Sequence, residues 1–276
     1  MNDQANNALE ISSINAKLTF FVDNGEPPIN YLTEDRVLER TGEYREHDLL
    51  LRDAREIKDA LSLDKQGFQL ISHNTKVKSF YNEDEVSNIY NSEVESLIKG
   101  ITKAKSVVVF DHTVRVEDHN LRSEKNVREP VMFVHNDYTQ DSGRQRVRDL
   151  FPREEAEDLL TRRFNIINIW RSIEGIVQTT PLAFCDADSI NPGQLITAER
   201  RTKERVGYTQ AMTFNEKNSW YYVSDMKPNE AVLLKTFESD ELNFGGPSGH
   251  TAFKNSNAPS NADARQSIET RVFAFY

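Results

Sequence analysis

The stretch Val131-Met132-Phe133-Val134-His135-Asn136-Asp137-Tyr138-Thr139 predicts a buried strand that ends in a His-x-Asp pair. Because side chains on a strand alternate between its two faces, His135 and Asp137 are expected to project to the same side. An imidazole and a carboxylate placed in this way can occupy neighbouring positions on one metal ion. A second histidine would complete a triad of two histidines and one carboxylate, which suits ferrous iron and leaves coordination positions open. The alternative is a half-buried strand end that carries two polar residues by chance.

Six histidines are available to complete the triad, and most of them precede the His-x-Asp pair. They are His47, His73, His112, His119, His135 and His250. On a jelly-roll barrel the distal histidine usually comes from a late strand, and His250 is the one that follows His135 along the chain. It ends a glycine-rich turn, 245–249, and leads into an apolar segment. We therefore expect His135, Asp137 and His250 to be the metal ligands. His112 is the next candidate, and its alternative role is that of a hydrogen-bonded core histidine.

A third element follows His250 by fifteen residues. Arg265 and Ser267 begin the strand-like run 265–276 and share one face of it. A guanidinium fork and a hydroxyl that point the same way can hold a carboxylate. The order His-x-Asp, distant His, Arg-x-Ser is far more specific than any of its parts.

These motifs resemble the family of non-haem iron oxygenases that groups the cephamycin-cluster protein CmcJ, fungal gibberellin desaturase and the hydroxylase/desaturase AsaB. The resemblance runs from about Leu49 to Arg271. It rests on the segments 107–115 (VVVFDHTVR), 134–139 (VHNDYT), 168–171 (NIWR), 235–239 (KTFES), 250–253 (HTAF) and 265–271 (RQSIETR). Two departures are visible, since Glu238 replaces a usual aspartate and Ala264-Arg265-Gln266-Ser267 replaces a usual Pro-Arg-Glu-Ser. Neither departure removes a ligand.

The resemblance implies a jelly-roll fold and an enzyme that uses iron(II), 2-oxoglutarate and dioxygen. By the same resemblance, 2-oxoglutarate would chelate the iron and place its far carboxylate on Arg265 and Ser267. Its oxidative decarboxylation to succinate would drive hydroxylation, desaturation or ring closure of a small molecule. The family does not imply a particular substrate.

The composition bounds the class of protein. Hydrophobic residues make up 37% of the 276 residues and charged residues 28%, and the formal net charge is −10. A negative chain of this kind argues against binding to nucleic acid or to an anionic membrane, both of which require a basic face. No apolar run is long enough to span a bilayer. The polar N-terminus does not read as a signal peptide, and the single cysteine, Cys185, cannot form an internal disulfide. We therefore expect a cytoplasmic protein with a small-molecule substrate; the oligomeric state stays open.

The order of the expected elements indicates a mostly β protein with flanking helices and a double-stranded β-helix core, the jelly-roll or cupin-like architecture. We expect residues 1–14 to be disordered and residues 15–276 to form a single jelly-roll oxygenase domain with a helical insertion near 140–163. Apolar steps of three and four residues predict an amphipathic helix over 83–101. The sequence predicts core strands at 106–116, 164–171, 208–214, 220–223 and 231–237, and a charged loop at 117–129.

Three residues of the strand 164–171 are candidates for substrate binding. Asn168 and Trp170 share one face of this strand, and Arg171 lies on the other. A buried arginine needs an anionic partner, so Arg171 is expected to bind a substrate carboxylate, unless it forms a structural ion pair. Lys235 interrupts another apolar strand; we expect it to extend to solvent, and a salt bridge is the alternative.

The sequence thus predicts an iron(II)- and 2-oxoglutarate-dependent dioxygenase that activates a C–H bond of a small metabolite, in secondary metabolism. The metabolite is expected to carry a carboxylate, as an amino acid does. Two other classes stay open: a cupin-like metal enzyme that does not use 2-oxoglutarate, and a non-catalytic jelly-roll binding module.

Overall fold

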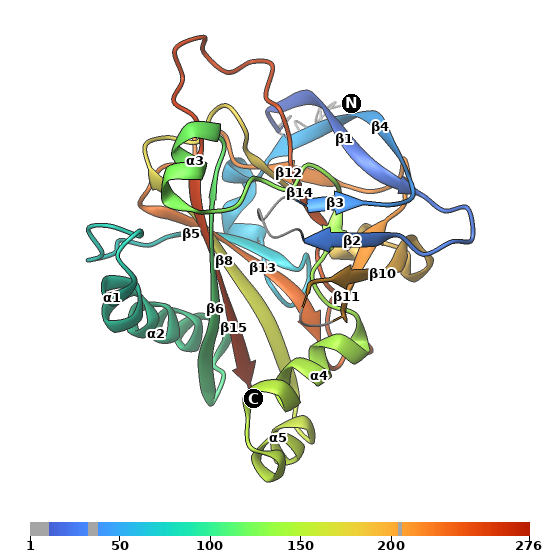
Figure 1. The fold of residues 1–276 in the computed structure, drawn as a ribbon, viewed down its shortest axis with the longest axis vertical. Coiled ribbons are helices and arrows are strands. Elements are labelled where there is room, and N and C mark those ends of the chain that lie inside the picture. The colour runs from blue at the N-terminus through green and yellow to red at the C-terminus, as the bar shows by residue number, and fades with distance from the viewer. Residues whose placement is uncertain (1–10, 33–37, 204–205) are drawn as a thin grey trace, which may run out of the picture.

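Two β-sheets face each other and form a jelly roll, as the sequence predicts (Figure 1). The computed structural model describes residues 11–32, 38–203 and 206–276. The larger sheet has ten strands, in spatial order β1 (Ser13–Val22), β4 (Glu43–Asp53), β12 (Trp220–Tyr222), β9 (Leu182–Cys185), β14 (His250–Ala252), β7 (His135–Asn136), β11 (Val206–Met212), β10 (Leu195–Arg201), β2 (Ile29–Leu32) and β3 (Leu38–Arg40). The smaller sheet has five, in the order β5 (Phe68–Ser72), β13 (Glu230–Glu238), β8 (Phe164–Glu174), β15 (Gln266–Phe275) and β6 (Ser106–Val116).

The helices cover the five-stranded sheet and close one end of the barrel. They are α1 (Glu83–Glu85), a π-helical turn (Val86–Tyr90), α2 (Asn91–Thr102), α3 (His119–Lys125), α4 (Gln140–Leu150) and α5 (Arg153–Leu160). Short 3₁₀ turns lie at Ala54–Ala60, Ala187–Ser189 and Pro192–Gln194. No helix in the described ranges is long and apolar enough to cross a lipid bilayer.

The central strand β8 is buried on both of its faces, so side chains on either face lie in the core of the protein. Ile167 and Ile169 point outward and pack beneath α2 in a hydrophobic cluster. Trp170 belongs to a different cluster, which includes residues of the opposing sheet. The strand therefore has a helix on one side and the barrel interior on the other.

The helix predicted over 83–101 is present. Asn82 caps its start by accepting the backbone N–H groups of Asp84 and Glu85, and the helix ends at Lys103, which has a left-handed φ of 61°. The two helices expected behind the His-x-Asp pair are confirmed as α4 and α5, which pack on the end of the barrel near the C-terminus (Figure 1).

The strand predicted over 131–139 is wrong in extent, because β7 contains only His135 and Asn136. The chain before it hydrogen-bonds to more than one strand. The carbonyl of Val131 accepts from Ala252, whereas the N–H of Val134 donates to Thr19 on β1. A segment that bonds to more than one strand does not form a continuous ladder.

The charged segment 117–129 was predicted to be a loop, but it contains the helix α3. Asp118 caps this helix by accepting the N–H of Leu121 at 2.7 Å, and Asn126 ends it with a left-handed φ of 53°. An aspartate before the first turn and an asparagine after the last are ordinary signals of helix ends.

Lys235 does not extend to solvent as expected. Its side chain is fully buried on β13, and its Nζ lies 3.2 Å from the carboxylate of Glu238. The carboxylate of Glu238 also binds Arg163 at 2.9 Å and Asn165 at 2.6 Å. A buried ammonium is tolerated because this carboxylate and its hydrogen bonds compensate the charge.

The N-terminal prediction is tested only in part. Strand β1 begins at Ser13, inside the segment 1–14 that was expected to be disordered. Residues 1–10 lie outside the described part of the chain. The single-domain assignment for 15–276 stays a prediction.

Two glycines provide a matched test of how tightly α4 packs. A Cβ added at Gly143 would lie 2.2 Å from the ring of Phe237, whereas a Cβ at Gly100 in α2 would meet nothing within 4 Å. Gly143→Ala should therefore lower the free energy of unfolding by about 1–3 kcal/mol through overpacking. Gly100→Ala should raise it by up to about 1 kcal/mol through helix propensity. Urea unfolding followed by circular dichroism measures both; equal stability of the two variants would contradict this packing.

Candidate metal centre and pocket

Strand pairing brings the three predicted metal ligands together. His250 on β14 pairs directly with His135 on β7, and their ring centroids lie 4.5 Å apart. Asp137 follows β7, and its Oδ1 lies 3.6 Å from Nε2 of His135. One potential ligand atom from each of the three residues lies within 4.8 Å of the others. Residues that are far apart in the sequence thus converge on one point.

Both imidazoles are oriented by backbone carbonyls. Nδ1 of His135 donates to the carbonyl of Phe133 at 2.9 Å, and Nδ1 of His250 donates to that of Ser248 at 3.2 Å. A carbonyl only accepts, so each Nδ1 carries the proton and each Nε2 presents a lone pair. Nε2 of His250 is buried and has no hydrogen-bond partner among the described residues. A buried lone pair without a partner is costly, and a metal ion bound at this position would satisfy it.

Asp137 is held through one of its two oxygens. Its Oδ2 accepts from Nδ2 of Asn168 at 2.8 Å and from Nε of Arg271 at 3.0 Å, so Oδ1 remains for a metal. The neighbouring Arg271 guanidinium holds the pKa of Asp137 well below its usual range, against the opposing effect of burial. Burial lowers the pKa of His135 to about 3, and His250 acts in the same direction. At neutral pH Asp137 is therefore a carboxylate and His135 a neutral imidazole, the forms that bind iron(II).

Arg271 orients the metal carboxylate Asp137, a role that was not predicted from the sequence. Besides Asp137 it binds Asp111 at 2.5 Å, and it also hydrogen-bonds to Glu269. Arg265, Ser267, Glu269 and Arg271 alternate along one strand, so their period of two was a signal that all four share a face.

The predicted carboxylate clamp is assembled at the start of β15. Nε of Arg265 donates to Oγ of Ser267 at 3.0 Å, and its NH1 donates to the carbonyl of Thr180 at 3.0 Å. The guanidinium lies 4.8 Å above the ring of Trp170. Arg265 is only 3% exposed, and no ion pair joins it to a carboxylate in the described part of the chain. Burial lowers its pKa to about 9, so the site favours an anion that would restore the balance of charge.

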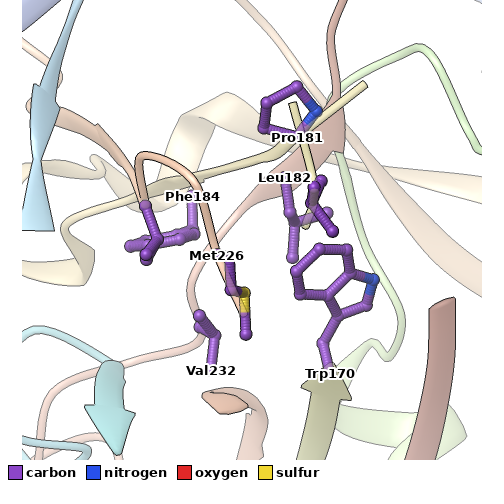
Figure 2. Close-up of a pocket in the computed structure, with 8 residues that line it drawn as sticks. Trp170, Pro181, Leu182, Phe184, Met226 and Val232 are labelled. Carbon is purple, nitrogen blue, oxygen red and sulfur yellow. The ribbon is translucent and has the colours of Figure 1, made fainter. Parts of the chain in front are cut away.

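The two histidines of the metal site and Arg265 of the clamp line one pocket. The residues that line it are Arg115, Val131, His135, Trp170, Leu182, His250, Thr251, Ala252, Arg265 and Glu269. Trp170 and Leu182 also border a second, apolar pocket, where Figure 2 shows them beside Met226 and Val232. The pocket thus has a charged side at the metal and an apolar floor.

Two of the predicted substrate residues have other roles. Arg171 lies on the outer face of β8, where its NH1 is 3.0 Å from Nδ1 of His73 and its NH2 bonds to the carbonyl of Pro228. It is 1% exposed and does not line the pocket, so its assignment as a substrate anchor is wrong. Asn168 holds Asp137 instead of facing substrate. Trp170 does line the pocket, and its indole N–H is buried without a partner in the described residues.

His112 does not compete with His250 for the metal. Its Nδ1 lies 2.8 Å from Oγ1 of Thr270, and its Nε2 lies 2.8 Å from Oδ1 of Asn91. Both ring nitrogens are thus engaged away from the metal centre, as expected for a core histidine.

Comparison with known proteins assigns the chain to a family. Residues 18–275 match the family described as "Oxidoreductase/YMDC permease-like domain". The chain belongs to this family. The "Hydroxylase/desaturase efuI" of Hormonema carpetanum is 28% identical over 98% of this chain and 97% of its own length. The "Fe(II)/2-oxoglutarate-dependent dioxygenase nvfI" of Aspergillus novofumigatus is 29% identical over 83% of each chain.

A solved structure supports the fold of this oxidoreductase. The "iron and alpha-ketoglutarate-dependent endoperoxidase NvfI" superposes with a TM-score of 0.83, covers 95% of this chain and 98% of its own, and is 25% identical. Together the relatives identify the chain as a non-haem iron(II)- and 2-oxoglutarate-dependent dioxygenase that acts on a small molecule. Its cofactors are iron(II), 2-oxoglutarate and dioxygen. The two other classes that the sequence left open are therefore set aside.

Arg271→Lys tests whether Arg271 orients Asp137 for metal binding. The lysine keeps the positive charge but lacks the planar guanidinium group that hydrogen-bonds to three carboxylates. We expect the affinity for a divalent metal to fall about 10- to 100-fold, because a group that orients a ligand is removed. Anaerobic titration with cobalt(II), followed by its visible absorption, measures the affinity. Arg148→Lys is the matched control, since Arg148 binds the exposed Glu157 and does not line the pocket. Unchanged cobalt affinity in Arg271→Lys would show that Asp137 does not depend on this pair.

Proposed function

We propose that His135, Asp137 and His250 bind the catalytic iron(II) of this dioxygenase, and that Arg265 and Ser267 bind 2-oxoglutarate. The enzyme then activates a C–H bond of a small, carboxylate-bearing metabolite in secondary metabolism, an amino acid being one example. The observation that carries the proposal is the unpartnered Nε2 of His250, which lies beside His135 and Asp137 inside a buried pocket.

The protein residues contribute position and charge to the reaction. Bound iron(II), together with 2-oxoglutarate and dioxygen, supplies the power to oxidise an unactivated C–H bond. The backbone carbonyls of Phe133 and Ser248 hold the two imidazoles in the required tautomer. Asn168 and Arg271 keep Asp137 ionised and leave one of its oxygens for the metal.

Arg265 and Ser267 are suited to the distal carboxylate of 2-oxoglutarate. The Arg265 guanidinium lies over the ring of Trp170 and donates a hydrogen bond to the carbonyl of Thr180. Its orientation is therefore fixed before the cosubstrate binds. A preorganised fork loses little entropy when it binds a carboxylate. The unpartnered indole N–H of Trp170 offers a further donor to the cosubstrate or to the substrate.

The shape of the pocket supports a small substrate. The pocket beside His135 and His250 must hold 2-oxoglutarate as well as the reacting part of the substrate. Hydroxylation, desaturation and oxidative ring closure each begin with the removal of one hydrogen atom, so the same arrangement of ligands serves all three outcomes. Orientation of the substrate decides which hydrogen is removed.

The chemistry of the chain supports a reducing, cytoplasmic setting. Cys185 is buried and its burial raises the pKa of the thiol to about 12, so it is an unreactive core residue. The net charge of −10 supports a small-molecule enzyme that binds neither nucleic acid nor membrane.

Arg265→Ala tests the clamp. Loss of a charge-assisted pair to a buried carboxylate costs about 2–5 kcal/mol, so half-saturation with 2-oxoglutarate should require roughly 30- to 4000-fold more cosubstrate. The measurement is succinate formed by the iron(II)-loaded enzyme as the 2-oxoglutarate concentration is varied. Arg148→Ala, a change on the exposed surface of α4, should behave like wild type. An unchanged 2-oxoglutarate requirement in Arg265→Ala would remove Arg265 from the clamp.

A further inference from the structure

Arg200 lies on the same face of the ten-stranded sheet as the metal ligands. Residues Ile196 and Arg200 of β10 are four apart, so they share one face. Ile196 pairs with Ala211 on β11, and Ala211 pairs in turn with His135 on β7. Side chains of residues paired across strands point to the same side. Arg200 therefore faces the interior from β10, which is separated from the metal strand β7 by β11.

Arg40 lies on the same face of the sheet as Arg200, and the two residues form a basic row. Arg200 pairs with Asn30 on β2, and Asn30 pairs with Arg40 on β3. The guanidinium of Arg40 lies 4.7 Å above the ring of Phe133, and that ring is 5.5 Å from the ring of His135. One aromatic ring thus separates the Arg40 cation from a predicted metal ligand.

The five-stranded sheet contributes two more arginines. Arg115 on β6 lines the pocket beside His135 and His250, and its NH1 donates to the carbonyl of Glu129 at 2.8 Å. Arg128 joins Arg115 through an isolated β-bridge. Burial lowers the pKa of Arg128 to about 10, and the nearby cations Arg200 and Arg115 act in the same direction. Guanidinium groups from both sheets are therefore close enough to repel one another.

The carboxylates in this region share one direct partner. Asp111, Asp137 and Glu269 all hydrogen-bond to Arg271. No ion pair joins Arg115 or Arg128 to a carboxylate within the ranges that the structure describes. Bound iron(II) and 2-oxoglutarate together would not change the net charge of this region, because the charge of a divalent cation and that of a dianion cancel. In a chain with a net charge of −10, the cation Arg115 in the pocket and its bridge partner Arg128 indicate a site for an anion.

We propose that Arg115 and Arg128, with Arg200 and Arg40 at the rim, form a subsite that binds a carboxylate of the primary substrate. This subsite adjoins the clamp at Arg265, because Arg115 on β6 pairs with Ser267 on β15, and it replaces Arg171 as the substrate anchor. It deepens the proposed function, on which it rests, by naming the substrate as an organic acid and by placing its acidic group on the β6 and β10 side of the metal. Guanidinium forks bind carboxylates at two points, which would orient the rest of the substrate toward the metal.

Binding of a matched acid and amide tests this subsite without turnover. The full chain is loaded with zinc(II), which is redox-inert, and saturated with 2-oxoglutarate so that the clamp is occupied. Phenylacetate and phenylacetamide are then titrated separately by calorimetry. The two probes differ in charge and have nearly the same shape. We expect wild type to bind phenylacetate at least about tenfold more tightly than phenylacetamide, with a preference that falls as salt is added.

Variants assign the preference to particular residues. Arg128→Gln should lose most of the tenfold preference, and Arg128→Lys should keep part of it because the charge remains. Arg148→Gln, the same change on an exposed helix, should behave like wild type. Equal binding of acid and amide by the wild-type protein, or no binding of either, would overturn the proposal even if Arg128→Gln fails to fold. Full preference in folded Arg128→Gln would also overturn it.

A separate measurement distinguishes a failure of the anion subsite from a failure of the proposed function. Iron(II)- and 2-oxoglutarate-dependent succinate formation by the wild-type protein, without added substrate, tests the metal and clamp assignments alone. If succinate forms but phenylacetate is not preferred, the anion subsite is wrong and the proposed function stands. If phenylacetate is preferred but no succinate forms, the subsite stands and the proposed function fails.

Discussion

The buried ion pair between Asp137 and Arg271 is the interaction on which the rest of the site depends. It joins the segment that follows β7 of one sheet to β15 of the other, so it fixes the metal carboxylate relative to the clamp. A carboxylate buried without such a partner would take up a proton and lose its value as a metal ligand. The same guanidinium binds Asp111 and Glu269, which couples the metal centre to the inner face of the smaller sheet.

The jelly roll supports this charged interior by surrounding it with apolar layers. Helix α2 covers the outer face of the five-stranded sheet, and α4 and α5 pack against aromatic residues at one end. The charged side chains of β6 and β15 therefore face inward between two sheets. Arg271 binds three carboxylates, whereas no ion pair joins Arg265, Arg115 or Arg128 to a carboxylate in the described part of the chain. A bound anionic cosubstrate and a bound anionic substrate would compensate the positive charge of these arginines.

Much of the fold and the metal triad could be predicted from the sequence. His135, Asp137 and His250 were predicted as a triad from motif order, and the structure brings them together; that they bind iron stays a prediction. Arg171 was misplaced for a physical reason. Both faces of β8 are buried, so neither hydrophobicity nor period two shows which face lines the barrel, and α2 decides it.

Other features could not be read from local sequence. Strands β2 and β3 are short, and β10 is charged, so their positions depend on pairing with distant residues. The basic row formed by Arg40 and Arg200 arises only from that pairing. The true extent of β7 likewise depends on which strand each neighbouring residue bonds to.

The most direct test of the account is iron binding by His250→Ala, compared with His112→Gln. Equilibrium dialysis against iron(II) without oxygen measures the metal held per chain, independently of turnover, and circular dichroism confirms that each variant is folded. The account predicts one iron per chain in wild type and in His112→Gln, and nearly none in His250→Ala. Full iron binding by folded His250→Ala, or loss of iron from folded His112→Gln alone, would contradict the proposed metal centre.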